Sequence, residues 1–287
     1  MTTAQLNPPY QDVQAHYDLS NRFFELFLAP TMMYTCAYYE REDMTHEEAQ
    51  EAKIKLALDK CDLKPGQRLL DVGCGWGLMT IRAVENYGVQ GIGISLSNDQ
   101  IKFAREWARP LGDRAEFRVQ GWEEFEEPVD RIVAICSTEH FREERYATFF
   151  AKCHRLLPPK APMLIQVIVF PEYEAQQEKC LTWTEADIAF ARFISKKIFP
   201  GGQLRSPSVL CRYAKEAGFR TTLIQSLQPH YATTLDCWAE RLQASREVAI
   251  ELTSQETYDM YMHYLTGCAD RYRCGKLDVV QISLEKV

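Results

Sequence analysis

The sequence predicts an α/β fold, with a seven-stranded, mostly parallel sheet and helices on both of its faces. Apolar runs of strand length alternate with amphipathic helical patterns through the middle of the chain. A glycine-rich loop over residues 73–77 follows the first of these runs. Hydrophobic residues fill 46% of the 287 positions, enough for the core of one large domain. We therefore expect a single domain over 1–287, with an N-terminal helical segment over 1–62 and a helical cap insertion over 171–205.

The first half of the chain predicts a regular order of strands and helices. Thr45-His46-Glu47-Glu48 is a capping box, which predicts a helix that runs to about Lys60. Apolar runs predict strands at residues 67–73, 89–94, 115–119, 131–136 and 163–169. Helical patterns lie between them, at residues 78–87, 98–109 and 142–157. Because neighbouring parallel strands need a crossover, this β–α–β order indicates a parallel sheet.

The cap interrupts this order in the second half. The helical pattern around residues 183–198 places four apolar residues on one face: Ile188, Ala191, Ile194 and Ile198. We expect this face and a helix over 234–250 to line a tunnel for a long chain; the alternative is that the face only packs on the domain. The remaining pattern predicts a helix at 208–217, strands at 220–227 and 278–284, and a helix at 254–272.

Composition excludes several classes of partner and site. The net charge is −7, and no run of Lys and Arg is long enough to bind phosphates, so we expect no nucleic acid. No stretch approaches the ~20 apolar residues of a membrane span. The first residues lack the pattern of a secretory signal, so we expect a cytoplasmic protein. The ten cysteines contain no C-x-x-C pair, which favours free thiols and no metal site.

The glycine loop does not have the spacing of a dinucleotide site. It reads D-x-G-x-G-x-G from Asp71 to Gly77, where a dinucleotide fold needs G-x-G-x-x-G. A carboxylate at Asp71 would repel a pyrophosphate, but it suits a ligand with an ammonium and a sulfonium group. The second strand ends without the acid that binds a dinucleotide ribose, although Ser95 and Gln100 can hydrogen-bond to a ribose as neutral groups. The alternative is a glycine turn that only packs a helix on the sheet.

The stretch LLDVGCGWG (69–77) resembles motif I of the S-adenosylmethionine-dependent methyltransferases, which implies a Rossmann-like class I methyltransferase fold. Further words along the chain resemble the cyclopropane fatty acid synthase family: VQAHYDLSNRFFELFLAPTMMYTCAYYE (13–40), QGWEEF (120–125), VDRIV (129–133), EHF (139–141), IFPGGQL (198–204), SLQPHYATTL (226–235) and YMHYLTGC (261–268). Without a long N-terminal extension, the chain is most similar to the mycobacterial mycolic acid methyltransferases. The resemblance implies methyl transfer from S-adenosylmethionine to a carbon–carbon double bond of a long unsaturated (mycolic-type) acyl chain. The product is a cyclopropane, or a methyl-branched or hydroxylated chain.

The resemblance also implies a set of cofactor-binding residues. Tyr34 and Thr35 are expected at the methionine end of the cofactor, with the loop beneath it: Asp71, Gly73, Cys74, Gly75, Trp76 and Gly77. Ser95, Leu96 and Gln100 are expected along the ribose. Gly121 and Trp122 are expected at the adenine, where a bare peptide turn can bond to its edge while the indole covers its face.

The reaction leaves a carbocation, which makes two demands on the site. Aromatic faces stabilise a cation by ~0.5–2 kcal/mol each, and the candidates are Phe23, Phe24, Tyr34, Tyr38, Tyr39 and Tyr231, which can also be an ordinary core cluster. A base must then take a proton. In the family this is a bound bicarbonate, and the resemblance assigns its contacts to Glu139, Tyr231 and the backbone at Cys36. Cys268 corresponds to a cysteine proposed as a nucleophile, and it marks the site even without that role.

The sequence departs from the family at three positions. Gln166 replaces a histidine, and an amide can donate to an anion but cannot carry its proton. Cys136 and Thr138 stand where the family often has glycine and an apolar ring. These changes predict more polarity beside the reacting carbon, and hence a shift from ring closure toward a hydroxylated or methyl-branched product.

Other functions and partners stay open at this point. One alternative is a C- or O-methyltransferase of a small secondary metabolite, and another is a silent lipid- or cofactor-binding protein. Arg192, Lys196 and Lys197 are expected on other sides of the cap helix, where they can meet an acidic acyl carrier protein or simply face solvent. The position of the double bond, the chain length, the carrier and the oligomeric state are not determined by the sequence.

Overall fold

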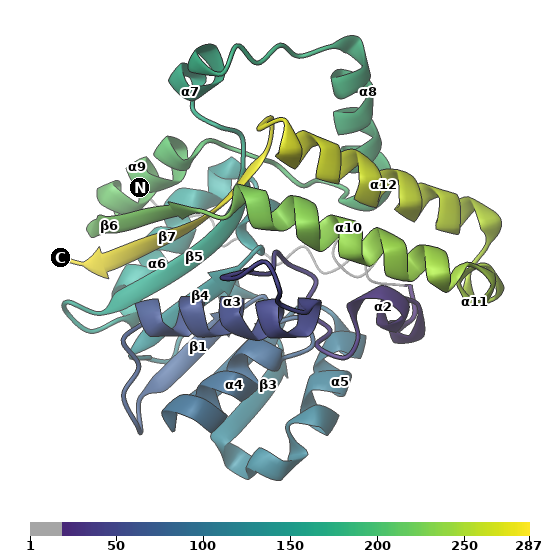
Figure 1. Ribbon diagram of the computed structural model, residues 1–287. Helices are drawn as coiled ribbons and strands as arrows, with labels where there is room; N and C mark the ends of the chain where they lie inside the picture. The colour runs from purple at the N-terminus through teal and green to yellow at the C-terminus, as the bar shows by residue number, and fades with distance from the viewer. Residues whose placement is uncertain (1–18) are drawn as a thin grey trace.

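A seven-stranded sheet forms the centre of the molecule, in a computed structural model that describes residues 19–287 (Figure 1). Residues 1–18 of the predicted N-terminal segment lie outside the described residues. The strand order is β3-β2-β1-β4-β5-β7-β6. The strands are β1 (Arg68–Val72), β2 (Gln90–Ser95), β3 (Ala115–Val119), β4 (Arg131–Ile135), β5 (Pro162–Val169), β6 (Phe219–Ser226) and β7 (Asp278–Lys286). Strands β1 to β5 pair in parallel, and β7 lies antiparallel between β5 and β6, so the predicted mostly parallel sheet is confirmed.

Helices cover both faces of the sheet because successive strand residues point to opposite sides. Leu69 packs with α3 (His46–Lys60) and α4 (Leu78–Tyr87) on one face. Its neighbour Leu70 packs with α6 (Tyr146–Leu156) and α9 (Pro207–Glu216) on the other. Helix α5 (Asn98–Trp107) packs on β3 beside α4. Some boundaries are shorter than predicted, since 3₁₀ turns form at Arg109–Arg114 and Glu143–Arg145.

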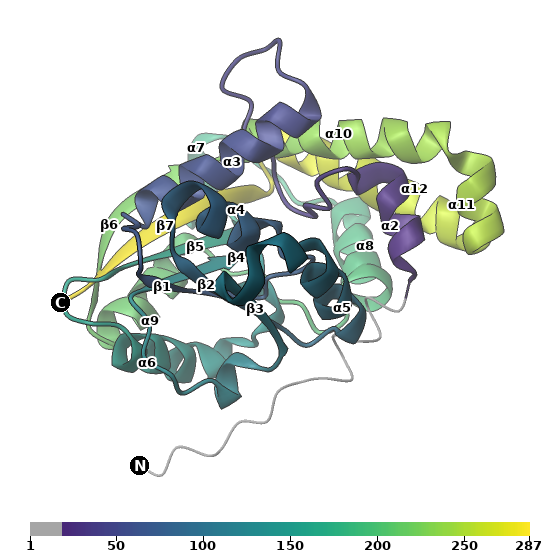
Figure 2. The same ribbon diagram turned by 90° about the horizontal axis from the view of Figure 1, so that it is seen from below.

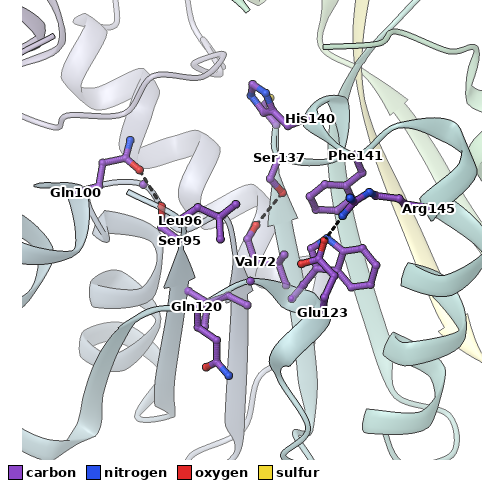
Figure 3. A pocket seen from close by; sticks show the side chains of 16 residues that line it. Val72, Ser95, Leu96, Gln100, Gln120, Glu123, Ser137, His140, Phe141 and Arg145 are labelled. Carbon is purple, nitrogen blue, oxygen red and sulfur yellow. Dashed lines mark hydrogen bonds and ion pairs between the residues drawn. The ribbon is translucent and has the colours of Figure 1, made fainter. Parts of the chain in front are cut away.

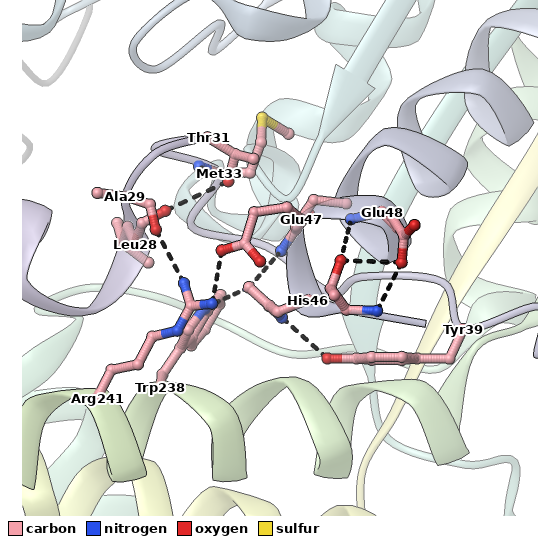
Figure 4. Close-up of polar contacts among 12 residues, drawn as sticks. Leu28, Ala29, Thr31, Met33, Tyr39, His46, Glu47, Glu48, Trp238 and Arg241 are labelled. Atoms are coloured by element: carbon pink, nitrogen blue, oxygen red, sulfur yellow. Dashed lines mark hydrogen bonds and ion pairs between the residues drawn. The ribbon is translucent and has the colours of Figure 1, made fainter. Parts of the chain in front are cut away.

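The N-terminal segment, with α2 (Asn21–Leu28) and α3, is tied to the C-terminal half of the chain (Figure 4). The predicted capping box of α3 is present at Thr45. Arg241 donates hydrogen bonds to the carbonyl oxygen of Ala29 at 2.8 Å and to the Glu47 carboxylate at 2.5 Å. The Trp238 indole N–H donates to Nε2 of His46 at 3.1 Å. These bonds hold the start of α3 against the helix that carries Trp238.

Three C-terminal helices pack beyond the carboxyl ends of the strands: α10 (Gln228–Ala244), α11 (Arg246–Leu252) and α12 (Gln255–Arg273). The prediction of one helix over 234–250 was wrong at its start and in its continuity. The helix begins at Gln228 because Pro229 is tolerated in a first turn, and it breaks at Ser245. Helices α10 and α12 run side by side (Figures 1 and 2).

The predicted cap is helical and is joined to α12. It consists of α7 (Tyr173–Glu178), α8 (Glu185–Phe193) and a π-helical turn at Ile194–Ile198. Asp187 on α8 forms ion pairs with Arg271 at 3.1 Å and Lys276 at 2.6 Å. The Arg271 guanidinium also lies 3.7 Å from the centre of the Phe190 ring. The cap is therefore anchored by charge as well as by apolar packing.

Two expectations from composition can be compared with the structure. The ten cysteines all lie within the described residues, and each is a free thiol. Among residues 19–287, no helix has the length and apolarity needed to span a bilayer.

Candidate active site

A first cavity lies at the carboxyl ends of β1, β2 and β4, which is where open α/β sheets bind their ligands (Figure 3). We call it the glycine-loop cavity. Seven of the predicted cofactor residues line it: Gly73, Gly75, Ser95, Leu96, Gln100, Gly121 and Trp122. Further lining residues include His140, Phe141 and Arg145, which the sequence analysis did not assign to the cofactor site. His140 and Phe141 directly follow Glu139 after β4, and Arg145 lies six positions after it, so proximity to Glu139 was the signal available for them.

The loop conformation depends on glycine at Gly73. Its φ is +78°, and a Cβ there would lie 2.4 Å from Cβ of Ser137, so no other residue fits without a shift. Ser137 donates a hydrogen bond to the carbonyl oxygen of Val72 at 2.8 Å. At Gly75, by contrast, a Cβ would meet no atom within 4 Å in the described part of the chain. The backbone at Gly75 is thus open to close approach by a ligand.

The wall at β2 and β3 offers neutral polar groups. The Ser95 hydroxyl donates to Oε1 of Gln100 at 3.0 Å and accepts from the backbone N–H of Ser97 at 3.2 Å. Gln120 also lines the cavity, and its Oε1 is buried without a hydrogen-bond partner in residues 19–287. These groups suit the hydroxyls of a ribose, and the open backbone at Gly75 suits a ligand that lies on the loop. The cavity therefore fits S-adenosylmethionine in its donor set.

Trp122 forms the far wall of the glycine-loop cavity. It is buried, and its ring packs against Phe141 at 5.5 Å and edge-on against Phe149 at 5.2 Å between centroids. Arg145 pairs with Glu123 at 2.6 Å beside it (Figure 3). The indole is thus held rigidly where the resemblance expects the adenine.

A second cavity of about 810 Å³ lies between the cap, α10 and α12, and we call it the cap cavity. Its volume is within the range of ligand pockets, and apolar and aromatic side chains dominate its lining. Four predicted site residues line it: Tyr34, Glu139, Tyr231 and Cys268. Cys136 and His140 line both cavities, so the two spaces adjoin at these residues.

Glu139 sits on a 3₁₀ turn, Thr138–His140, at the carboxyl end of β4, as predicted. Its side chain is buried, and Oε1 accepts the backbone N–H of Ile168 at 2.7 Å. Burial raises the pKa of Glu139 to about 7, while hydrogen bonds from Ile168, Cys136 and Thr138 act in the opposite direction. A carboxyl group with this pKa can both take and give a proton near neutral pH.

Aromatic rings face one another in the cap cavity. Tyr231 and Tyr272 have ring centroids 4.7 Å apart, and the Tyr272 hydroxyl finds no hydrogen-bond partner in the described chain. Tyr264 and Tyr272 were not predicted, although they flank Cys268 at four-residue spacing on one face of α12. That spacing was the available sequence signal.

Other aromatic candidates belong to the core. Phe23 and Phe24 are fully buried in a ring cluster with Tyr261 and Trp76. Tyr38 contacts His230 at 4.8 Å between ring centroids, and the Tyr39 hydroxyl hydrogen-bonds to His46. The core-cluster interpretation therefore fits Phe23 and Phe24, with Tyr38 half-buried against that cluster and Tyr39 half-buried outside it, while Tyr34 and Tyr231 line the cap cavity.

Five predicted cofactor residues lie behind the glycine-loop cavity instead of on its surface. Three of them pack into the core: Cys74, Trp76 and Gly77. Thr35 accepts a hydrogen bond from the buried Lys53 ammonium at 3.0 Å. Asp71 accepts from the Thr80 hydroxyl at 2.8 Å on the side of α4, and burial raises its pKa to about 7.

Two predicted catalytic residues also lie behind the cavity walls. The Cys36 thiol is buried and donates to the carbonyl oxygen of Ala37 at 3.1 Å, while the predicted contact through the backbone at Cys36 stays a prediction. Burial raises the pKa of Cys36 far above that of an ordinary thiol. Gln166 is fully buried, and its amide nitrogen lies 3.6 Å from Sγ of Cys136. Of the three departures from the family, Cys136 lines the cavities, while Thr138 and Gln166 lie in the layer behind.

The cap helix supplies most of the predicted tunnel face. Ile188, Ala191 and Ile194 line the cap cavity, but Ile198 is turned into the core because the π-helical turn changes the register of side chains. Leu235 of α10 lines it as well, as expected for a residue of 234–250. The placement of Arg192 away from this face was wrong, since it lines the cavity while remaining exposed.

Comparisons with known proteins find relatives that match nearly the whole chain. The family model described as mycolic acid cyclopropane synthetase matches residues 4–282. Cyclopropane mycolic acid synthase 3 of Mycobacterium tuberculosis is 50% identical over 286 residues, covering 99% of this chain and 100% of the relative. The solved structure of the cyclopropane synthase MmaA2 from Mycobacterium tuberculosis is 47% identical, with a TM-score of 0.95, covering 99% of this chain and 100% of that one. The mycolic acid cyclopropane synthase CmaA1, solved in complex with SAH and CTAB, is 48% identical with a TM-score of 0.92 over the same shares.

More distant structures share the fold alone. Coclaurine N-methyltransferase is 18% identical with a TM-score of 0.80, covering 96% of this chain and 82% of that one. The Rossmann-like class I methyltransferase fold expected from the sequence is therefore confirmed.

Proposed function

This chain belongs to the mycolic acid cyclopropane synthetase family and is an S-adenosylmethionine-dependent methyltransferase; on that premise, we propose that it methylates a carbon–carbon double bond of a long acyl chain held in the cap cavity. The observation that carries this proposal is the meeting of the two cavities at Cys136 and His140. One cavity has the neutral polar groups and open glycine backbone for the cofactor. The other has the apolar lining and volume for a chain. In this proposal the alkene carbon meets the methyl group at the boundary that the two cavities share.

The residues around the glycine-loop cavity bind and orient the cofactor in this proposal. Gly73 and Gly75 provide the floor, Ser95 and Gln100 bond to the ribose, and Trp122 covers the adenine. The cofactor supplies an electrophilic methyl group. Because an alkene is a weak nucleophile, the chain's contribution is to hold the two reactants in line and to exclude water.

Methyl transfer leaves a positive charge on the acyl chain, and the cap cavity is suited to it. The faces of Tyr34, Tyr231 and Tyr272 can stabilise the cation without reacting with it. Loss of a proton from the new methyl group lets its C–H electron pair close the cyclopropane ring. We assign that proton to the carboxylate of Glu139, whose pKa of about 7 suits a base near neutral pH.

The bicarbonate expected from the family has only part of its contact set in the cap cavity. Glu139 and Tyr231 line the cavity, but Cys36 is not among its lining residues, and Gln166, which replaces the family's histidine, lies behind Cys136. We therefore propose that the Glu139 carboxylate acts directly. Depleting bicarbonate from the assay should leave the rate unchanged. A rate that depends on added bicarbonate would instead support an anion between Glu139 and Tyr231.

The polar replacements give limited support to a hydroxylated product. Only Cys136 of the three lines the cavities, so the predicted polarity beside the reacting carbon is smaller than the sequence suggested. We propose ring closure as the main outcome. Mass spectrometry in ¹⁸O-labelled water separates the products, since a cyclopropane gains one CH₂ and no label, and a hydroxylated chain gains CH₂ and one labelled water.

The central experiment is turnover with labelled S-adenosylmethionine and a lipid extract. We expect label in a long acyl chain, and no transfer to small metabolites. A small acceptor would leave most of the 810 Å³ cavity unfilled, which favours the long chain over a small secondary metabolite. Label in small molecules alone would contradict the proposal, and cofactor binding without any turnover would support a silent binding protein.

An acyl carrier protein is the proposed donor of the chain. Lys196 and Lys197 are exposed on the cap, near the exposed Arg192 at the cavity. An acidic carrier would meet these charges. Reversing both lysines to glutamate should raise KM for carrier-bound substrate and leave cofactor affinity unchanged. An unaltered KM would leave the lysines as a solvated face.

A further inference from the structure

A line of polar side chains runs from the half-buried Lys60 on α3 across β7 and β5 toward Glu139. The Lys60 ammonium donates to Oε1 of Gln281 at 2.6 Å, and the Gln281 amide donates to Oε1 of Gln166 at 3.0 Å. The Gln166 amide donates in turn to Sγ of Cys136 at 3.6 Å. Cys136 lies beside Glu139 in the wall of the cap cavity, and its side chain opposes the burial that raises the pKa of this carboxyl group. Gln166 and Gln281 are both fully buried, so no water replaces these bonds at low cost.

The direction of the line follows from its first member. Burial lowers the pKa of Lys60 to about 8, so near neutral pH the group is an ammonium with three donors and no acceptor, and the Gln281 atom that faces it must be oxygen. The Gln281 nitrogen therefore faces Gln166, whose facing atom must be oxygen. The Gln166 nitrogen must then face Cys136, which leaves the thiol hydrogen for Glu139. One charged group thus determines the orientation of two amides that could otherwise rotate by half a turn.

We infer that Lys60 and Gln281 are positioning residues for the reaction, which aim the Gln166 amide and the Cys136 thiol at Glu139 so that its carboxylate form is favoured. This inference rests on the proposed role of Glu139. Each bond in the line donates toward Glu139, and aligned hydrogen bonds in a buried site strengthen one another. The sequence departures at Cys136 and Gln166 then act together as one donor unit. Neither the Gln166 amide nor the Cys136 thiol hydrogen needs to touch the acyl chain.

Gln281→Glu tests the direction without changing the shape. The introduced carboxylate can only accept, so it keeps the bond from Lys60 and forces the Gln166 amide to rotate. The Gln166 oxygen then faces Cys136 and takes the thiol hydrogen away from Glu139. Gln225→Glu is the matched control, because Gln225 accepts from the same ammonium at 2.6 Å and pairs with Gln281 across β6 and β7, but lies outside the line.

The readouts are the pH dependence of kcat, cofactor affinity, and the protonated-carboxyl band of Glu139 by infrared titration, with Glu139→Gln to identify the band. For Gln281→Glu we expect kcat near neutral pH to fall about tenfold, because a hydrogen bond to a charged group is lost, and the acid limb and the infrared pKa to move to higher pH. Cofactor affinity should not change. Lys60→Arg should keep the wild-type pH dependence. Lys60→Met should move the acid limb and the infrared pKa in the same direction as Gln281→Glu, by a smaller amount, and it replaces Gln281→Glu as the test if that variant does not fold.

Two results would overturn the inference. Equal shifts in Gln281→Glu and Gln225→Glu would show that added charge is sufficient, and no shift in either would show that the line has no influence on Glu139. If the wild type itself transfers no methyl group, the proposed function fails instead. The infrared titration still decides whether the line controls Glu139, because it needs no substrate.

Discussion

Replacing Glu139 by glutamine should make the protein more stable and inactive. The carboxyl group is buried at 7% exposure, and burial raises its pKa from 4.5 to about 7. The folded state therefore holds this proton more tightly than the unfolded state. The stability that the tighter binding of this proton gives the folded state is fully present below pH 4.5 and is lost as pH rises through 7, by a total of about 3 kcal/mol. The glutamine oxygen can still accept the Ile168 N–H, so the variant avoids this loss without forfeiting the bond.

The assay is urea unfolding of both proteins at pH 5 and at pH 8. The stability of Glu139→Gln relative to the wild type should increase by about 2–3 kcal/mol between these values, while methyl transfer falls by at least about 100-fold because a positioned base is lost. The reasoning fails if the difference in unfolding free energy is the same at both pH values, since the carboxyl group would then titrate normally in the fold. Retained activity would remove Glu139 as the base.

Three further predictions concern packing and buried charge. Gly267→Ala places a Cβ 2.2 Å from the Phe190 ring, so the cost of overpacking, about 1–3 kcal/mol, should outweigh the gain in helix propensity of about 1 kcal/mol. The KM for the acyl substrate should rise, and cofactor affinity should not change. A wild-type KM together with a raised Tm would contradict this prediction. Gly73→Ala forces a Cβ against Ser137 at positive φ, and calorimetry should show cofactor binding at least about tenfold weaker. Burial lowers the pKa of Lys53 to about 8, so the charge on Lys53 costs stability below that pH, and the cost is relieved as pH rises toward 10.5. Lys53→Met should therefore be more stable than the wild type at pH 7, by an amount that shrinks toward pH 10. A difference in stability that stays constant with pH would refute the lowered pKa of Lys53.

The sequence predicted the sheet and the glycine-loop wall because both follow from local patterns. Strand runs and helix caps are encoded within a few residues of each other. The glycine loop is also a local pattern, because Gly73 has no room for a Cβ. The direction in which a side chain points was harder to predict from the sequence. Asp71 was expected to face the ligand, but a strand residue faces one side or the other, and Asp71 faces α4 and Thr80.

Residues joined only by tertiary packing could not be found from the sequence. Gln281 lies 115 positions from Gln166, and nothing local relates either of them to Lys60. The register of the cap was equally hidden, because the π-helical turn that rotates Ile198 into the core leaves no clear periodic signal.

The place of β7 in the sheet has a consequence for protein synthesis. β7 pairs with β5 on one side and with β6 on the other, although it is translated after both. Until residues 278–286 have been made and have left the ribosome, β5 and β6 each expose a row of unpaired backbone groups, which is the kind of edge that recruits foreign strands. A chaperone that shields nascent strands would therefore matter most for this enzyme between the emergence of β6 and that of β7.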